Sequence, residues 1–285
     1  MSPEDLSRAL VQPGRASIPY LDRYSPDRPL VLECFRPQGH NPDKPVVIVQ
    51  HGMSRNGAEY CEAWAPAAER HGFLIVAITF SKEAWPDAVT YNNGHVLDGD
   101  GSVRPRECWS QAIPARVFAL LREAGVTRRD KTYLWGHSAG GQFVHRLLAT
   151  QPHGVFEAVG AANSGWYALP TLDLHYPDGL GGIGLMHEDV VRLLGYPLVI
   201  FSGDLDIDVT AENFPRHEAA MAQGPNRFAR AQFYIAEAAK LGVPCRWSRV
   251  VVPGVAHEGM RMSAFSADYW FGGAGRGCSR RRACG

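Results

Sequence analysis

The stretch Tyr133-Leu134-Trp135-Gly136-His137-Ser138-Ala139-Gly140-Gly141 decides the fold of this 285-residue chain. Its pattern G-x-S-x-G lies between a predicted strand, Lys131–Trp135, and a predicted helix, Ala139–Thr150. So sharp a strand-to-helix turn favours Gly136 and Gly140, because Cβ atoms would collide in it. The turn lifts the Ser138 hydroxyl above the sheet, at a helix N-terminus that favours negative charge. Glycine and serine also form ordinary turns, but this setting predicts that Ser138 is a nucleophile.

Short apolar runs alternate with amphipathic ones along most of the chain. The runs predict strands, and the amphipathic segments predict helices, an order typical of an α/β fold with a mostly parallel central sheet and helices on both faces. Several runs are rich in Val, Ile and Leu, as expected for strands covered on both sides. The predicted strands are Leu30–Phe35, Val46–Gln50, Phe73–Phe80, Lys131–Trp135, Phe156–Ala161, Pro197–Phe201 and Arg246–Val252, and the predicted helices are Ala65–His71, Ser110–Ala124, Ala139–Thr150, Arg227–Leu241 and Arg261–Phe271.

A serine hydroxyl is a weak nucleophile and needs an adjacent base. Of the histidines downstream of Ser138, His145 and His153 lie within or just beyond the helix that follows the nucleophile, where they are badly placed. His257 follows the last predicted strand, on a loop ahead of the final helix. This position predicts His257 as the general base.

The acid of such a site is expected after the strand Pro197–Phe201, where Asp204, Asp206 and Asp208 alternate. In extended backbone all three share one face, so periodicity does not choose among them. An acyl transfer also needs donors for an oxyanion. Gly52 allows the backbone to turn after the strand Val46–Gln50, so the Met53 and Ala139 amides are the predicted oxyanion hole.

Two connections, 81–109 and 163–195, are long enough to suggest functional loops. Trp166 and Tyr167 follow a strand at the edge where ligands gather, and they are predicted to bind substrate, although aromatic side chains also pack under loops. Asp98-Gly99-Asp100 resembles the start of a calcium loop, but positions six and twelve are Val103 and Trp109 instead of the required Gly and Glu. We therefore expect no metal and no cofactor.

The composition argues against several classes of protein. Lys and Arg number 29, as do Asp and Glu, so the formal net charge is zero and no nucleic-acid or membrane partner is expected. The N-terminus lacks the pattern of a signal peptide, no apolar run is long enough to span a membrane, and the six cysteines form no C-x-x-C pair. We expect a cytoplasmic protein with reduced thiols.

The chain is divided by composition into three parts. Residues 1–24 are polar and predict an N-terminal surface arm, and residues 25–271 predict the catalytic domain. Residues 272–285 are rich in glycine and arginine and predict a disordered basic tail without an assigned function.

Four stretches together resemble the α/β-hydrolase superfamily: 51–53, Gly136–Gly140, Gly203–Val209 and Gly254–His257. Within it, the sequence from His51 to Ala65 is similar to the polyhydroxybutyrate-depolymerase and feruloyl-esterase group. The resemblance implies a serine esterase with a Ser/Asp/His catalytic triad, no cofactor and a small-molecule or oligomeric ester as substrate. It also favours Asp206, because the superfamily often shows Gly, two residues, Asp, two residues and an aliphatic residue at this bend.

Other functions remain open on these residues. A thioesterase, a peptidase or an acyltransferase uses the same triad, and fold does not choose the substrate. A non-catalytic ligand-binding protein on a hydrolase scaffold is the alternative from another class, but such proteins usually lack a member of the triad.

Overall fold

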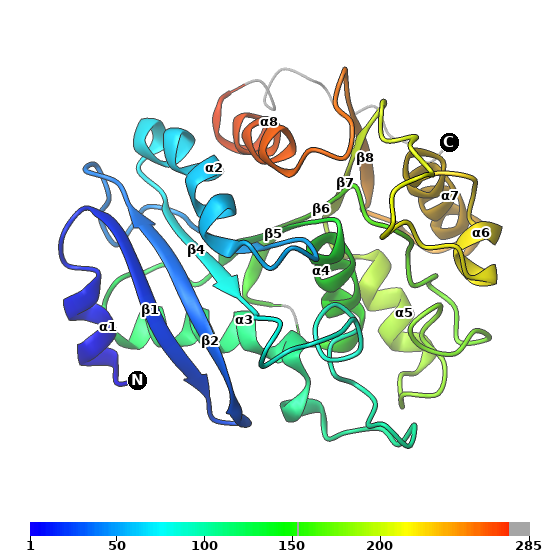
Figure 1. The fold of residues 1–285 in the computed structure, drawn as a ribbon, viewed down its shortest axis with the longest axis horizontal. Helices are drawn as coiled ribbons and strands as arrows, with labels where there is room; N and C mark the ends of the chain where they lie inside the picture. The colour runs from blue at the N-terminus through cyan, green and yellow to red at the C-terminus, as the bar shows by residue number, and fades with distance from the viewer. Residues whose placement is uncertain (153, 274–285) are drawn as a thin grey trace.

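A computed structural model describes residues 1–152 and 154–273, and within them eight strands form one sheet (Figure 1). The spatial order is β1-β2-β4-β3-β5-β6-β7-β8, with β1–β2 and β2–β4 antiparallel and the other neighbours parallel. The predicted α/β fold with a mostly parallel sheet is confirmed. The strands are β1 (Gly14–Asp22), β2 (Ser25–Arg36), β3 (Val46–Gln50), β4 (Leu74–Thr79), β5 (Thr132–His137), β6 (Phe156–Ala162), β7 (Leu198–Gly203) and β8 (Ser248–Val252).

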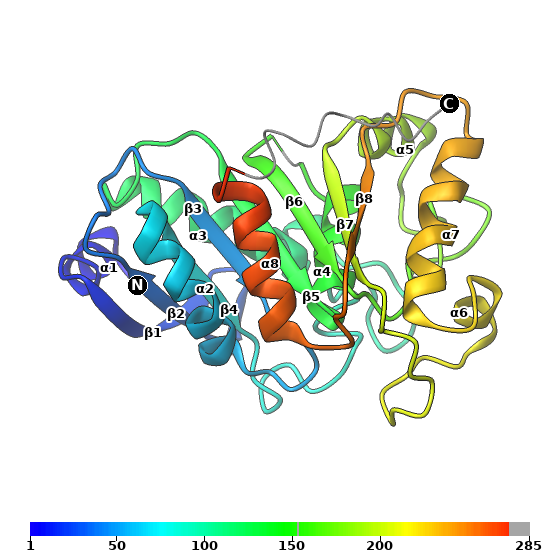
Figure 2. The same ribbon diagram turned by 90° about the horizontal axis from the view of Figure 1, so that it is seen from above.

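Helices cover both faces of the sheet. Helices α2 and α8 pack on one face, while α1, α3, α4, α5 and α7 contribute to the core on the other (Figures 1 and 2). The helices are α1 (Pro3–Ala9), α2 (Gly57–His71), α3 (Ile113–Glu123), α4 (Ala139–Thr150), α5 (His187–Leu194), α6 (Glu218–Ala222), α7 (Arg227–Lys240) and α8 (Gly259–Phe271). None of the helices in the described part of the chain is long and apolar enough to cross a membrane.

The central strand β3 shows why these strands read as continuous apolar runs. All five of its residues are buried. Val46 and Ile48 belong to the core under α3 and α4, whereas Val47 and Val49 belong to the core under α2 and α8. Successive side chains of a strand point to opposite faces, and both faces of β3 are covered, which explains why each residue from Val46 to Val49 is apolar.

The prediction that residues 1–24 form a surface arm is wrong. Helix α1 buries Leu6, and β1 pairs antiparallel with β2 as the edge strand of the sheet. The first four residues of β1 alternate between partly buried and exposed. Ile18 and Tyr20, later in the strand, are its buried apolar residues. An edge strand with one covered face needs few apolar residues, which is why its composition resembles that of an arm.

The long connection 81–109 is packed rather than disordered. Trp85, Tyr91 and Trp109 have no exposed surface and belong to the core. Asp98 and Asp100 stabilise a turn of this connection. Asp98 forms an ion pair with Arg104, and an Asp100 oxygen accepts a hydrogen bond from the Ser102 amide. The second long connection, 163–195, contains α5, which the sequence analysis missed.

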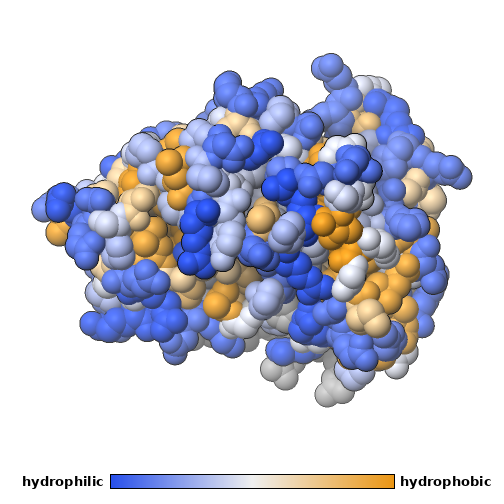
Figure 3. All heavy atoms as spheres, turned by 90° about the horizontal axis from the view of Figure 1, so that it is seen from below, coloured by the Kyte–Doolittle hydropathy of each residue, from blue (hydrophilic) through white to orange (hydrophobic). Residues whose placement is uncertain are grey.

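The face opposite α2 and α8 carries patches of hydrophobic residues among hydrophilic ones (Figure 3). Between the loop 170–173, α5 and the end of α7 lies a groove of about 240 Å³, and none of Ser138, Asp206 and His257 lines it.

The sequence predicts a disordered tail at residues 272–285. From position 274 onward this segment lies outside the described residues.

Candidate active site

Ser138 occupies the turn between β5 and α4. Its φ of +56° lies in the left-handed region, a conformation uncommon for a residue with a side chain and typical of strained functional positions. The two neighbouring glycines are required sterically. A Cβ on Gly136 would lie 2.1 Å from the Gly140 carbonyl oxygen, and one on Gly140 would lie 2.2 Å from the Gln50 carbonyl oxygen. Close packing of the strand, the turn and the helix therefore sets the position of Ser138.

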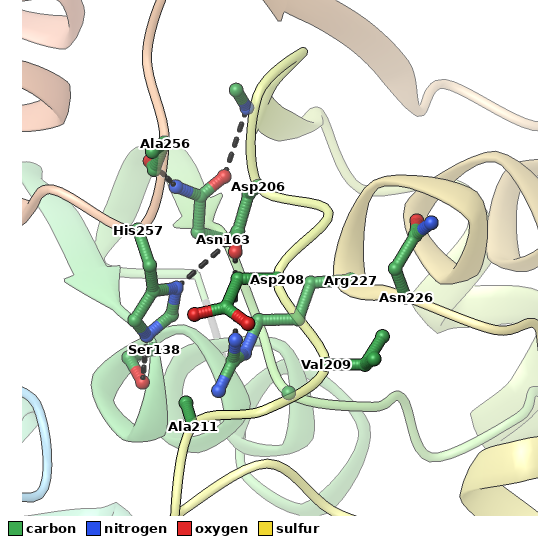
Figure 4. A network of polar contacts seen from close by, with 12 residues as sticks. Ser138, Asn163, Asp206, Asp208, Val209, Ala211, Asn226, Arg227, Ala256 and His257 are labelled. Atoms are coloured by element: carbon green, nitrogen blue, oxygen red, sulfur yellow. Dashed lines mark hydrogen bonds and ion pairs between the residues drawn. The ribbon is translucent and has the colours of Figure 1, made fainter.

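Three predicted side chains form one chain of hydrogen bonds (Figure 4). His257 Nε2 lies 2.9 Å from Ser138 Oγ, and His257 Nδ1 lies 2.8 Å from Asp206 Oδ2. A carboxylate only accepts hydrogen bonds, so the proton belongs on Nδ1 and the lone pair of Nε2 faces the serine hydroxyl. In this tautomer, Nε2 can accept a hydrogen bond from the Ser138 hydroxyl.

Among the three alternating aspartates, Asp206 is the one that contacts His257. The Asp206 amide donates to the Gly203 carbonyl, which closes a tight turn, and the side chain is 1% exposed. Asp204 instead accepts a hydrogen bond from the Gly254 amide, and Asp208 is exposed and accepts from Thr210. The backbone turn, rather than the alternation, separates the three carboxylates.

Arg227, at the start of α7, is a neighbour of this site that the sequence analysis missed. Its side chain is 2% exposed, and Nη1 lies 3.5 Å from Asp206 Oδ1. Burial lowers the pKa of Arg227, and the charge of Asp206 opposes this effect. The guanidinium compensates the negative charge of a buried carboxylate that also faces His257. No local pattern marks this arginine, because it is 21 residues away from its partner.

The turn after β3 lies against Ser138. A Cβ on Gly52 would be 3.7 Å from the Ser138 Cβ, and the Arg55 amide closes the turn by donating to the Gly52 carbonyl at 3.2 Å. Met53 lies in this turn, and Ala139 is the first residue of α4, whose amide has no acceptor within the helix. The structure therefore brings both predicted oxyanion donors to the neighbourhood of Ser138.

Residues from the long connection hold the turn in place. His51 Nε2 accepts a hydrogen bond from the Phe80 amide at 2.9 Å, and its Nδ1 contacts the Gly52 carbonyl at 2.8 Å. The Tyr91 hydroxyl donates to the His51 carbonyl at 2.7 Å. Arg55 lies 4.2 Å from the centre of the Tyr91 ring. Tyr91 of the connection 81–109 thus supports the turn that forms the candidate oxyanion hole.

Tyr60 of α2 contacts two segments of the site. Its hydroxyl lies 2.7 Å from Nδ1 of His137, the residue before Ser138, and the backbone of Gly52 packs against the same oxygen. Burial lowers the pKa of His137 well below its ordinary value, so the ring is neutral. The sequence analysis missed Tyr60, which lies before the predicted helix Ala65–His71 and 77 residues away from His137 in the chain.

The whole described chain resembles solved structures. It matches the poly(3-hydroxybutyrate) depolymerase LpqC from Bordetella parapertussis at 48% identity and a TM-score of 0.92, over 96% of this chain and 95% of that one. It matches poly(aspartic acid) hydrolase-1 from Sphingomonas sp. KT-1 at 32% identity and a TM-score of 0.87, over 90% of this chain and 98% of that one. No protein-family model and no curated protein sequence matches.

The chain belongs to the α/β-hydrolase superfamily. Its place is in the esterase group that includes polyhydroxybutyrate depolymerases, as the resemblance of the sequence predicted. More distant members share the fold alone, such as an S-formylglutathione hydrolase from Agrobacterium tumefaciens at 16% identity and a TM-score of 0.59, over 90% of this chain and 92% of that one.

The structure separates the two aromatic residues that were predicted to bind substrate in this α/β-hydrolase. Tyr167 has no exposed surface, and its ring stacks on Tyr234 of α7 at 4.4 Å between centroids. The prediction is wrong for Tyr167, because its side chain fills the core between α4 and α7. Trp166 is partly exposed, donates from its indole to Asp178, and lies 4.7 Å from the Arg146 guanidinium. Its role in substrate binding stays a prediction.

Buried neutral histidines predict that the hydrolase loses stability in acid. Burial lowers the pKa of His51 to about 3 and that of His95 to about 4, and it lowers the pKa values of His137 and His145 well below 6.5. Below pH ~6.5 the unfolded chain binds these protons and the folded chain does not, so stability is full above this pH and falls below it. Each such group lowers the free energy of unfolding by roughly 1 kcal/mol per pH unit.

Urea unfolding between pH 7.5 and 4.5 measures this effect. His145→Gln keeps a donor for the Gly141 carbonyl and an acceptor for the Ala168 amide, the two contacts that the ring makes. The variant is expected to show a shallower loss of stability in acid than the wild type. Exposed His187→Gln is the matched control with an unchanged slope. Equal slopes for His145→Gln and the wild type would contradict the prediction.

Proposed function

We propose that this α/β-hydrolase cleaves carboxylic esters through an acyl-enzyme intermediate on Ser138. The observation that carries the proposal is the hydrogen-bonded sequence Ser138–His257–Asp206, with both bonds shorter than 3 Å. Membership in the esterase group supports the reaction class. The proposal assigns each step to a side chain or a backbone amide of the site.

In the first half-reaction, Ser138 Oγ attacks the ester carbonyl carbon while His257 Nε2 accepts the hydroxyl proton. Asp206 keeps the proton of the imidazole on Nδ1 and stabilises the imidazolium that forms. The negative charge that develops on the carbonyl oxygen is stabilised by the Met53 and Ala139 amides. His257 then returns the proton to the alcohol oxygen as the carbon–oxygen bond breaks, which leaves the acyl group on Ser138.

In the second half-reaction, water takes the place of the alcohol. His257 accepts a proton from the water as it attacks the acyl carbonyl, and it gives the proton to Ser138 Oγ as the acid is released. Arg227 remains beside Asp206 throughout, so the buried carboxylate keeps its charge without a metal ion in the proposed mechanism.

A fluorophosphonate probe and a substrate panel test this function. We expect the probe to label Ser138, and we expect turnover of p-nitrophenyl esters, aryl esters or short hydroxybutyrate oligomers. The last are included because a 48% identical protein is a poly(3-hydroxybutyrate) depolymerase. Oligo-aspartate is included because a 32% identical protein is a poly(aspartic acid) hydrolase. Failure of the probe to label Ser138, with no ester cleaved, would favour a non-catalytic binding protein instead.

A further inference from the structure

Asn163 lies at the point where three segments of the active site meet. It directly follows β6, which lies between β5 and β7 in the sheet. Its side chain is enclosed, with the residue 3% exposed. The side-chain oxygen accepts a hydrogen bond from the Gly203 amide at 2.8 Å, and the side-chain nitrogen donates to the Ala256 carbonyl at 2.9 Å (Figure 4).

Both partners belong to segments that carry catalytic side chains. Gly203 begins the tight turn that ends at Asp206, whose amide donates back to the Gly203 carbonyl. Ala256 immediately precedes His257. The residue before Asn163 completes the set, since the Ala162 carbonyl accepts the Ser138 amide at 2.9 Å. The end of β6 therefore contacts the backbone of the nucleophile, the acid turn and the base loop.

Asparagine suits this position for two chemical reasons. Its amide offers one acceptor and one donor on the same planar group, and the Gly203 amide and the Ala256 carbonyl require one of each. Aspartate has no donor at neutral pH, and serine has a single oxygen. The φ of Asn163 is also +45°, in the left-handed region that asparagine adopts more readily than most residues with a side chain.

Apart from the hydrogen bond between Asp206 and His257, the contacts between the acid turn and the base loop lie farther from the imidazole. The Asp204 and Leu205 amides donate to the carbonyls of Val252 and Val255, and Asp204 accepts from the Gly254 amide. These bonds reach only as far as Val255 along the base loop. The Ala256 carbonyl, next to His257, accepts one hydrogen bond from the Glu258 amide within its own loop and one from the Asn163 side chain, which links it to the end of β6.

We propose that Asn163 is a positioning residue that keeps His257 in register with Asp206 and Ser138. The inference rests on the proposed function, because it assigns Asn163 a role in the same site. Asn163 touches neither the reacting atoms nor the imidazole, and it acts through the backbone of the two segments that carry the acid and the base.

The first test is Asn163→Gly. Glycine adopts the left-handed φ without strain, so the variant removes both side-chain bonds and leaves the backbone free to keep its conformation. We expect kcat to fall about 10- to 100-fold, since a displacement of about 1 Å in a catalytic group costs that much, with KM within about threefold of the wild type. Asn226→Gly is the matched control. Asn226 caps α7 through the Ala229 amide, and its kcat is expected to stay within about twofold of the wild type.

The second test separates positioning from stability. In an Asp206→Asn background the imidazole has already lost the carboxylate that fixes its catalytic tautomer, so Asn163→Gly is expected to cost less than about threefold in kcat. Asn163→Asp supplies a further variant if the glycine variant does not fold. It keeps the acceptor for Gly203 and places an oxygen against the Ala256 carbonyl, and its kcat is expected to fall at least about tenfold.

The outcomes distinguish the two proposals. A wild-type kcat in Asn163→Gly or, if that variant does not fold, in Asn163→Asp overturns the positioning role, as does a raised KM with kcat unchanged. A loss that is fully additive with Asp206→Asn overturns it as well. If Asp206→Asn itself has wild-type activity, the proposed triad fails and the inference fails with it. If Asp206→Asn loses its activity while Asn163→Gly remains fully active, the proposed triad stands and only the positioning role of Asn163 is overturned.

Discussion

Ser138→Ala is expected to lower kcat/KM for an activated ester by at least about 10³-fold, because the members of a triad act as one unit. The variant removes a single oxygen, which is hydrogen-bonded to His257 Nε2. Alanine keeps the Cβ that serine already places at a φ of +56°, so no new backbone strain arises. The folded state is therefore expected to persist, and the loss is expected in kcat rather than in KM.

Steady-state kinetics and thermal unfolding of the same preparation measure both effects. Ser81→Ala is the matched control. Its hydroxyl oxygen also serves a turn, as the acceptor for the Ala84 amide, away from the triad. It is expected to keep wild-type turnover. Near-normal turnover by Ser138→Ala, in a sample that no fluorophosphonate labels, would remove Ser138 from the mechanism.

Asp206→Asn is expected to lower kcat by about 10³- to 10⁴-fold. Asparagine has nearly the size of aspartate, but its amide nitrogen can donate to His257 Nδ1. That bond favours the tautomer with a proton on Nε2, which faces Ser138 and cannot accept the serine proton. Arg227 also loses the charge of its carboxylate partner, so a lower melting temperature is expected together with the loss of activity.

The neighbouring aspartates supply two matched controls for this variant. Asp204→Asn and Asp208→Asn each keep a side-chain oxygen for the amides of Gly254 and Thr210, the contacts that the carboxylates now make. Both are expected to stay within about fivefold of wild-type kcat, as neither carboxylate touches His257. The assay is one activated ester for all three variants. If Asp206→Asn remained active while Asp204→Asn or Asp208→Asn lost its activity, the role of the acid would pass to that neighbouring aspartate.

Local sequence determined the centre of the molecule. The predicted helix Ala139–Thr150 and strand Val46–Gln50 coincide with α4 and β3, and β5 and β7 begin within one residue of their predicted starts. These segments are encoded by contacts between near neighbours. Buried parallel strands need apolar residues throughout, and the turn at Ser138 excludes Cβ atoms at Gly136 and Gly140. The position of His257 followed from the same order of elements.

Tertiary structure decided what local pattern could not distinguish. Three alternating aspartates look alike in sequence, and a backbone turn at Gly203 directs Asp206 alone of the three to His257. An aromatic residue after a strand suits a pocket wall and a core equally well, and Tyr167 proved to be core because Tyr234 stacks on it.

The tertiary structure also decided the edge strand β1 and the residues that support the candidate site. β1 is a strand because β2 offers it a partner, and its own residues carry too few apolar side chains to show it. Arg227 and Tyr60 contact partners in the site that are 21 and 77 residues away in the chain. The two partners of Asn163 are 40 and 93 residues away. A local pattern records only the demands of neighbouring residues, whereas a hydrogen bond across the sheet depends on which segments the completed fold brings together.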